Sequence, residues 1–315
     1  MEETKRRPVP RKKNFGKHLV KSIPIYVMML PGVAYLFCNN YLPMFGILIA
    51  FKRVNWQVGL LKSPWAGVDN FRFLFQSKDA AVMIRNTILY NVVFIILGTT
   101  CAVAVAILLN EISKKIFKSV YQSLILLPYL MGWVVVSYLA FAMLSNETGF
   151  FNTMLRSMNL APVRWYQEVK YWPYILVFVN LWKSVGFSMI IYYSGIVGIS
   201  QEYYEAARLD GAGKWKQIVN ITLPLLKPTV ITMFIMSVGS IMASDFGLFY
   251  QIPKNQGMLY PATQTIDTYV YNAMMKLGNI SMSSAASVLQ SVVGFVLVLT
   301  ANAIVRKYEK ESALF

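Results

Sequence analysis

The chain has 315 residues, of which 56% are hydrophobic and only 14% are charged. Soluble domains carry about 25% charged residues, so this composition excludes an ordinary water-soluble globule and predicts a membrane protein. The formal net charge of +16 does not require a nucleic-acid partner, because the lysines and arginines gather at the ends of apolar segments, as they do in membrane proteins.

Residues 1–22 carry eight lysines or arginines and predict a basic cytoplasmic tail held near anionic lipid headgroups. A six-span domain is expected over 23–305, because apolar segments of about 20 residues suit membrane spans. The predicted spans are 24–48, 86–109, 120–144, 173–196, 229–250 and 284–305. Residues 306–315 form a short C-terminal tail.

Six spans place both chain ends on one side of the membrane. Lysine and arginine are enriched in the N-terminal tail, in the 111–119 loop, in the 197–225 loop and in the C-terminal tail. This bias predicts that all four lie in the cytoplasm. Cys38 and Cys101 both lie inside apolar runs, which predicts neither a disulfide nor a metal site.

The loop between the fourth and fifth spans contains a distinctive polar sequence. Glu205-Ala206-Ala207-Arg208-Leu209 is good helix-forming sequence, and Asp210-Gly211-Ala212-Gly213 is a turn signal. Lys214–Ile221 is expected to form a second short helix that Pro224 stops. The sequence therefore predicts a helix–turn–helix outside the membrane, with an ordinary cytoplasmic loop as the alternative.

The spacing from Glu205-Ala206-Ala207 to Gly211, followed by Ile221-Thr222-Leu223-Pro224, resembles the signature loop of bacterial ABC importer permeases. Over most of its length the chain is similar to the oligosaccharide (maltose-permease-like) superfamily, and within it to the LplB-like branch. The segments that carry the narrower resemblance are Ile49-Ala50-Phe51-Lys52, Ser63-Pro64-Trp65-Ala66-Gly67, Leu108-Leu109-Asn110-Glu111, Leu127-Pro128-Tyr129 and Trp182-Lys183.

This resemblance implies an all-α integral membrane protein with the type I ABC importer permease fold, in the bacterial cytoplasmic membrane. It implies a second permease subunit in a heterodimer, two ATP-binding cassette subunits and an extracytoplasmic sugar-binding protein. The implied function is uptake of oligosaccharides or polysaccharide fragments. ATP and Mg would bind to the ATPase partner, since no stretch of this chain fits the Gly-x4-Gly-Lys-Ser/Thr phosphate-binding pattern. No enzyme activity and no cofactor are expected in this chain.

In the resembling family the signature loop docks on the ATPase subunit, and seven residues are the candidates for that contact. They are Tyr203, Glu205, Ala206, Ala207, Leu209, Asp210 and Gly211. Glu205 would form a salt bridge or a cap, the alanines would keep the helix slim, and Gly211 would set the turn. Tyr203, Tyr204 and Leu209 would supply apolar contact, although Tyr203 and Leu209 could instead pack against the chain's own spans.

Candidates for the sugar pathway are polar and aromatic residues inside the spans. Ser237, Ser240 and Ser244 follow helical spacing, with Asp245 beyond them; the same spacing also suits close helix packing. The others are Trp182, Lys183, Phe187 and Gln290. Lys183 and Asp245 are costly within a membrane unless they are paired or face water, so they either pair with each other or line the cavity.

Two other functions stay open at this stage. An ABC permease for another solute, such as an amino acid, would share the signature loop. A secondary transporter would need ion-coupling acids or broken helices in repeated halves, and Asp245 is nearly alone among acids in the predicted spans.

Overall fold

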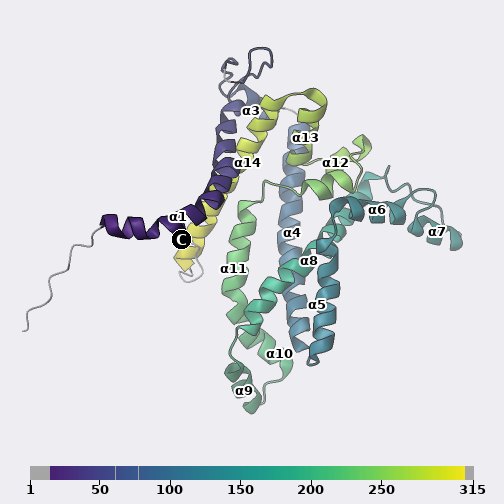
Figure 1. Cartoon of the computed structure of the whole chain (residues 1–315). Helices are drawn as coiled ribbons and strands as arrows, with labels where there is room; N and C mark the ends of the chain where they lie inside the picture. Colours follow the sequence, from purple (N-terminus) through teal and green to yellow (C-terminus); the bar gives the residue numbers. More distant parts are fainter. Residues whose placement is uncertain (1–14, 61, 77, 309–315) are drawn as a thin grey trace, which may run out of the picture. The chain divides into compact units, whose positions relative to one another are not determined.

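The computed structural model describes residues 15–60, 62–76 and 78–308, and these residues are almost entirely helical (Figure 1). Their β structure is limited to one isolated antiparallel bridge between Lys52 and Trp65. The chain forms two units, a small one that ends at Leu48 and a large one that begins at Ile49. Most of the predicted tail, residues 1–14, lies outside the described residues, as do residues 309–315.

The small unit is one continuous run of helical turns. Its elements are α1 (Phe15–Leu36), the π-helix η1 (Phe37–Tyr41), the 3-10 helix η2 (Leu42–Gly46) and α2 (Ile47–Ala50), which crosses into the large unit. Residues 15–22, predicted as part of a tail, are thus helical. Pro43 lies at the start of η2, where its missing N–H costs little.

The large unit contains the remaining helices. They are α3 (Asp69–Gln76), α4 (Lys78–Glu111), α5 (Lys115–Leu130), α6 (Trp133–Leu144), α7 (Phe150–Ser157), η3 (Val169–Tyr171), α8 (Trp172–Val197), α9 (Gln201–Leu209), α10 (Lys214–Gln217), η4 (Ile218–Thr222), α11 (Leu223–Gly239), η5 (Gly247–Gln251), η6 (Gly257–Leu259), α12 (Tyr260–Thr263), α13 (Ile266–Leu277) and α14 (Ile280–Tyr308).

Five helical segments of the described chain are long and apolar enough to cross a membrane: Ser22–Ala50, Asp79–Glu111, Val169–Val197, Lys214–Gly239 and Ile280–Lys307. A sixth arises when α5 and α6 are counted together, although they meet at 95°. The predicted span over 120–144 therefore corresponds to two helices joined at a sharp angle. α5 ends at Leu130 and α6 begins at Trp133, so Met131 and Gly132 form a sharp bend.

The fifth span lies earlier in the chain than the predicted range 229–250. Helical structure runs from Lys214 through η4 and α11 to Gly239, and residues 240–245 lie outside any helix. Pro224 does not stop this helix, because the π turn Ile218–Thr222 directly precedes it and widens the backbone where a proline N–H is absent. Pro228 lies inside α11, one turn further on.

In the large unit α4, α5, α8 and α11 run alongside one another, and α9 and α10 lie at one end (Figure 1). Small residues allow the helices to approach closely. A side chain on Gly186 of α8 would overlap the backbone of Ile125 in α5, and one on Gly294 of α14 would overlap the carbonyl of Gly239 in α11. Ala102 and Ala106 of α4 are also small residues, and both are fully buried.

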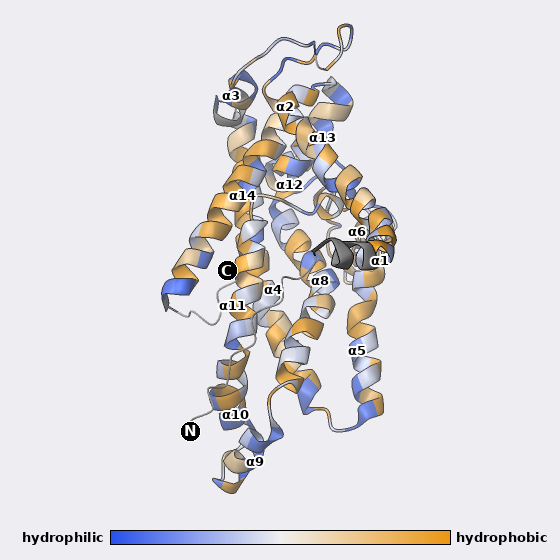
Figure 2. Ribbon diagram, turned by 60° about the vertical axis from the view of Figure 1, so that its left-hand side comes forward, coloured by the Kyte–Doolittle hydropathy of each residue, from blue (hydrophilic) through white to orange (hydrophobic). Residues whose placement is uncertain are grey.

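The opposite end of α4 is joined to the segment after η5 by side-chain hydrogen bonds. The Asn86 amide donates to the carbonyls of Pro261 and Gln264, and the Tyr90 hydroxyl donates to the Ala262 carbonyl. Hydrophilic residues collect around α9, α10 and the start of α5, whereas the ribbons above them are mostly hydrophobic (Figure 2). This distribution suits helices that cross a bilayer between two polar ends.

Candidate coupling surface and transport pathway

α9 is a short, well-capped helix, as the sequence predicts. The Ser200 hydroxyl accepts a hydrogen bond from the Glu202 backbone N–H at its start, and Arg208 lies in its last turn. Both features stabilise a helix end. The chain then turns at Gly211, whose φ is +74°, and the N–H of Ala212 donates to the Ala207 carbonyl at 2.8 Å. The turn assigned to Gly211 is thus confirmed.

The α9–α10 segment carries large side chains that the described residues leave mostly uncovered. Leu209 is 90% exposed, Trp215 is 75% exposed and Tyr203 is 57% exposed. Glu205 and Ala206 are also exposed, and Ala207 is half-buried. The alternative in which Tyr203 and Leu209 pack against the chain's own spans is therefore wrong. Such a patch on a small helical projection is typical of a protein contact.

Tyr204 faces the other way. Its hydroxyl lies 3.0 Å from the Thr222 hydroxyl in η4, so it braces the loop internally and does not join the exposed patch. Trp215 is a member of the patch that the sequence analysis missed. A tryptophan in the polar run after Gly213 was the signal, because an aromatic ring there has no span to pack into.

One salt bridge anchors the segment to the bundle, and one hydrogen bond braces the segment internally. Lys214 Nζ lies 2.7 Å from a carboxylate oxygen of Glu111, the last residue of α4. The buried Gln217 amide donates to the Ala212 carbonyl at 2.8 Å. Since α8 reaches α9 through only residues 198–200, a force applied to the patch would reach α4, α8 and α11 together.

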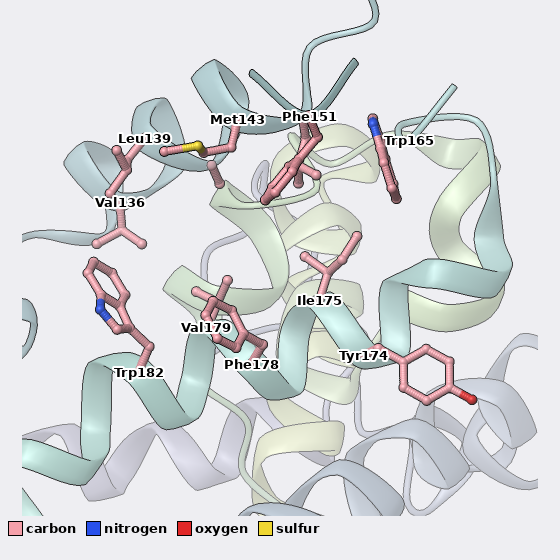
Figure 3. Close-up of a pocket in the computed structure, with 12 residues that line it drawn as sticks. Val136, Leu139, Met143, Phe151, Trp165, Tyr174, Ile175, Phe178, Val179 and Trp182 are labelled. Carbon is pink, nitrogen blue, oxygen red and sulfur yellow. The ribbon is translucent and has the colours of Figure 1, made fainter. Parts of the chain in front are cut away.

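Trp182 and Phe187 both lie on α8 but in different surroundings. Trp182 lines a cavity of about 650 Å³ between α6, α7 and α8, whose side chains are all apolar or aromatic (Figure 3). Phe187 stacks on Tyr129 of α5, with ring centroids 4.5 Å apart. Polar groups contribute very little of this cavity's surface, so the cavity suits sugar hydroxyls poorly and the surroundings of Trp182 argue against a sugar contact.

Lys183 has a specific structural task at the α5–α6 bend. It is buried, and its ammonium donates to the carbonyls of Tyr129 and Met131 at 2.8 and 2.7 Å and to that of Pro128 at 3.4 Å. These carbonyls lie at the C-terminal end of α5, where helix carbonyls lack partners and carry partial negative charge. A cation from α8 thus replaces the hydrogen bonds that the bend removes.

Asp245 is linked to Lys183 through a tryptophan and not by a direct ion pair among the described residues. The Trp133 indole N–H donates to Asp245 Oδ2 at 3.0 Å, while its ring lies 5.0 Å from Lys183 Nζ. The same ring rests on Gly247, where any side chain would overlap it. Direct pairing of Lys183 with Asp245 is therefore wrong, and Trp133 is the residue that joins them.

The three serines do not form a stripe on one helix, because α11 ends at Gly239. Ser237 is helical and donates to the Met233 carbonyl, whereas Ser240 is the exposed residue that follows the helix and donates to Ser237. Ser244 lies in the non-helical residues 240–245 that follow α11, which we call the α11 break.

Ser244 and Gln290 meet at a carboxylate that the sequence analysis overlooked, that of Asp267. The backbone N–H and the hydroxyl of Ser244 donate to Asp267 Oδ2 at 2.6 and 2.8 Å, and the Gln290 amide donates to the same oxygen at 3.2 Å. Asp267 lies in the first turn of α13, a favourable place for a negative charge. This network ties the α11 break to α13 and α14.

The two serines beside the break should respond differently to alanine. We expect Ser240→Ala to leave stability and uptake nearly unchanged, because its bond is local and exposed. Ser244→Ala removes a hydrogen bond to a carboxylate, worth about 1.5–3 kcal/mol, and should lower the thermal unfolding temperature. Unfolding curves of both variants in the same detergent, with uptake assays beside them, test this. Equal stability in the two variants would contradict it.

Comparison with known proteins identifies the architecture. Residues 94–310 match the family described as binding-protein-dependent transport system inner membrane component. Protein LplB of Bacillus subtilis (strain 168) is 31% identical over 287 residues, which cover 91% of this chain and 90% of that protein. The polygalacturonan/rhamnogalacturonan transport system permease protein YteP of the same strain is 31% identical over 293 residues, or 93% and 91% of the two chains.

A solved structure agrees over the same length. A chain of a bacterial alginate ABC transporter, in complex with an alginate pentasaccharide-bound periplasmic protein, has a TM-score of 0.83 and 29% identity, and the match covers 93% of this chain and 98% of that one. The family match begins within α4 and includes the bent α5–α6 pair, the 197–225 loop and α11. The chain therefore belongs to the binding-protein-dependent transport system inner membrane components, and it is a permease subunit of an ABC importer.

Proposed function

We propose that this permease imports oligosaccharides or polysaccharide fragments and is driven by ATPase subunits that bind the exposed face of α9 and α10. The observation that carries the proposal is the uncovered patch of Tyr203, Leu209 and Trp215 on a well-capped projection. The signature loop of ABC importer permeases falls on these same residues. ATP and Mg would be bound by the ATPase partner, and this chain would contribute the moving part.

The patch and the α5–α6 bend belong to one mechanical path. α8 leaves the patch through residues 198–200 and carries Lys183 further along the same helix. If closing ATPase subunits displace the patch, α8 moves as a rigid body. Lys183 then moves with respect to the carbonyls of α5, and Trp133 transmits the change to Asp245. This sequence of contacts links ATP-driven motion to the end of the bundle that lies away from α9 and α10.

The substrate class rests on the relatives. YteP is named for polygalacturonan and rhamnogalacturonan transport, and the similar structure is that of an alginate importer. We therefore propose uptake of polysaccharide fragments delivered by an extracytoplasmic sugar-binding protein, through a pathway shared with a second, different permease subunit. An assembly reconstituted in liposomes should take up oligogalacturonide or alginate oligosaccharide only when ATP and the binding protein are present. Uptake of an amino acid in place of either sugar would overturn this assignment.

Glu205→Lys should abolish sugar-stimulated ATP hydrolysis while the protein still inserts in the membrane. Glu205 is exposed on α9 and belongs to no ion pair among the described residues, so its charge is available to an ATPase surface. The measurement is ATPase turnover in nanodiscs with and without the loaded binding protein. Glu147→Lys, an equal charge change on an exposed residue before α7, is the control and should retain stimulation. Stimulated hydrolysis in Glu205→Lys would mean that the coupling contact lies elsewhere.

Both chain ends are expected in the cytoplasm. A reporter fused after Tyr308 should be active as a cytoplasmic reporter, and one inserted at Asn255, between η5 and η6, should report the outside. A single span, α14, lies between these points in the proposed topology, together with the short helices α12 and α13. Two reporters on the same side would contradict the six-span arrangement.

A further inference from the structure

In addition to the cavity beside Trp182, a groove lies between α4 and α8. It has a volume of about 900 Å³ and is open along one side. Its walls are apolar for most of their length, with Leu89, Val93 and Leu97 on α4 and Val177, Phe178 and Leu181 on α8. Most side chains along these walls offer no hydrogen-bond partner to a sugar hydroxyl, so the groove suits a second sugar site poorly.

One end of the groove carries two cations. Arg85 and Lys170 line it there, and both are exposed. The Arg85 guanidinium is held by the Pro261 carbonyl at 3.1 Å and by the Asn86 side chain, both through Nη2. Lys170 Nζ lies 3.7 Å from Glu168, but both side chains are largely exposed, and such pairs contribute little. The cationic end can therefore accept a negatively charged group.

The depth of this end matches the membrane interface. Tyr171 and Tyr174 follow Lys170 in sequence, and Tyr174 is exposed; tyrosines at the end of a span are typical of the lipid headgroup level. From Arg85 to Leu97 the helix α4 rises about 18 Å at 1.5 Å per residue. Half of a bilayer's hydrocarbon core is about 15 Å thick. An acyl chain that starts at the cations would thus reach the bilayer centre within the groove.

We propose that this groove is a binding site for an anionic phospholipid, with its phosphate between Arg85 and Lys170 and one acyl chain along α4 and α8. Charge complementarity selects this occupant, because a zwitterionic lipid brings its own cation to the same place. A transmembrane helix of the second permease could also fill the groove, but it would need an acidic residue at the level of the lipid headgroups to match the two cations.

Native mass spectrometry of the assembled transporter tests the proposal. The complex is incubated with equal amounts of phosphatidylglycerol and phosphatidylcholine, and the ratio of the two lipids retained is measured. Each interfacial Lys or Arg contributes about fivefold to anionic lipid binding. The double variant Arg85→Gln/Lys170→Gln should therefore lower the ratio by at least that factor. Arg72→Gln/Lys276→Gln removes two exposed charges outside the groove and should leave the ratio unchanged.

Two further variants separate lipid binding from a structural role. Arg85→Lys retains the charge and should preserve the ratio even if its bond to Pro261 is weakened. Val93→Trp fills the groove without a change of charge and should remove one bound phosphatidylglycerol. An unchanged ratio in the double glutamine variant would overturn the proposal. So would a cross-link from Leu89→Cys to the second permease in the assembled complex, since that helix would then occupy the groove.

Discussion

Gly211→Pro is expected to abolish transport while leaving membrane insertion and the six-span bundle intact. Gly211 has φ of +74°, and its N–H donates to the Arg208 carbonyl at 3.1 Å. Proline fixes φ near −65° and has no N–H, so the chain cannot make this turn. α9 would then point in another direction, and the patch of Tyr203, Leu209 and Trp215 could no longer meet one surface. The measurement is sugar uptake beside ATPase turnover in the reconstituted assembly.

A graded series at Gly211 separates backbone conformation from side-chain bulk. There is open space where a Cβ would be added, so a larger residue does not clash. Asparagine visits the left-handed region readily, whereas alanine pays about 1–2 kcal/mol for it. We expect Gly211→Asn to retain transport, Gly211→Ala to be intermediate and Gly211→Pro to be inactive. An equal loss of transport in the Gly211→Asn and Gly211→Pro variants would show that transport requires the absence of a side chain at this position, and not the left-handed turn.

Lys183→Met should destabilise the permease and stop transport. The ammonium pairs with three carbonyls at the end of α5, and methionine fills a similar volume without any donor. Each buried acceptor left without a partner costs about 1–3 kcal/mol, and inside a membrane no bulk water replaces the lost bonds. We expect a lower thermal unfolding temperature. We also expect that the end of α5 no longer moves together with α8. Unfolding in detergent and sugar uptake in liposomes measure the two effects.

The neighbouring groups provide matched controls for Lys183. Lys183→Arg keeps a cation beside the carbonyls and should recover most of the stability. Asp245→Asn keeps an oxygen that accepts from the Trp133 indole, and should be mild because Asp245 does not pair with Lys183 directly. A strong loss in Asp245→Asn, equal to that of Lys183→Met, would instead support an electrostatic pair between the two charges.

The α9–α10 segment could be predicted from the sequence because local signals determine its structure. Ser200 caps α9, Glu205 through Leu209 favour helix, and Gly211 supplies the only backbone conformation that the turn accepts. None of these depends on residues far away in the chain. The family resemblance rested in part on the same stretch, and both the fold and the transport class that it implied are confirmed.

The α5–α6 bend was not predictable in this way. Hydropathy continues unbroken through Met131 and Gly132, and the residue that stabilises the bend, Lys183, lies more than fifty positions further along the chain. The fifth span was misplaced for a related reason. Proline usually ends a helix, and nothing in the pattern around Pro224 reveals that a π turn precedes it. Asp267 was missed because its partners, Ser244 and Gln290, are brought together only by the break after α11.

The π turn Ile218–Thr222 lies between α10, which carries Trp215, and α11. A π turn holds one residue more than the α-helical turn it replaces, so it absorbs that residue while the helical turns on either side keep their relative orientation. Losing one residue there would let the helix close into a regular α turn, and Trp215 would face as before. Losing one residue from the regular helix of α11 would instead rotate α10 by about 100° relative to the rest of α11. The π turn is thus a place in this segment where the chain can change in length by one residue without redirecting Trp215.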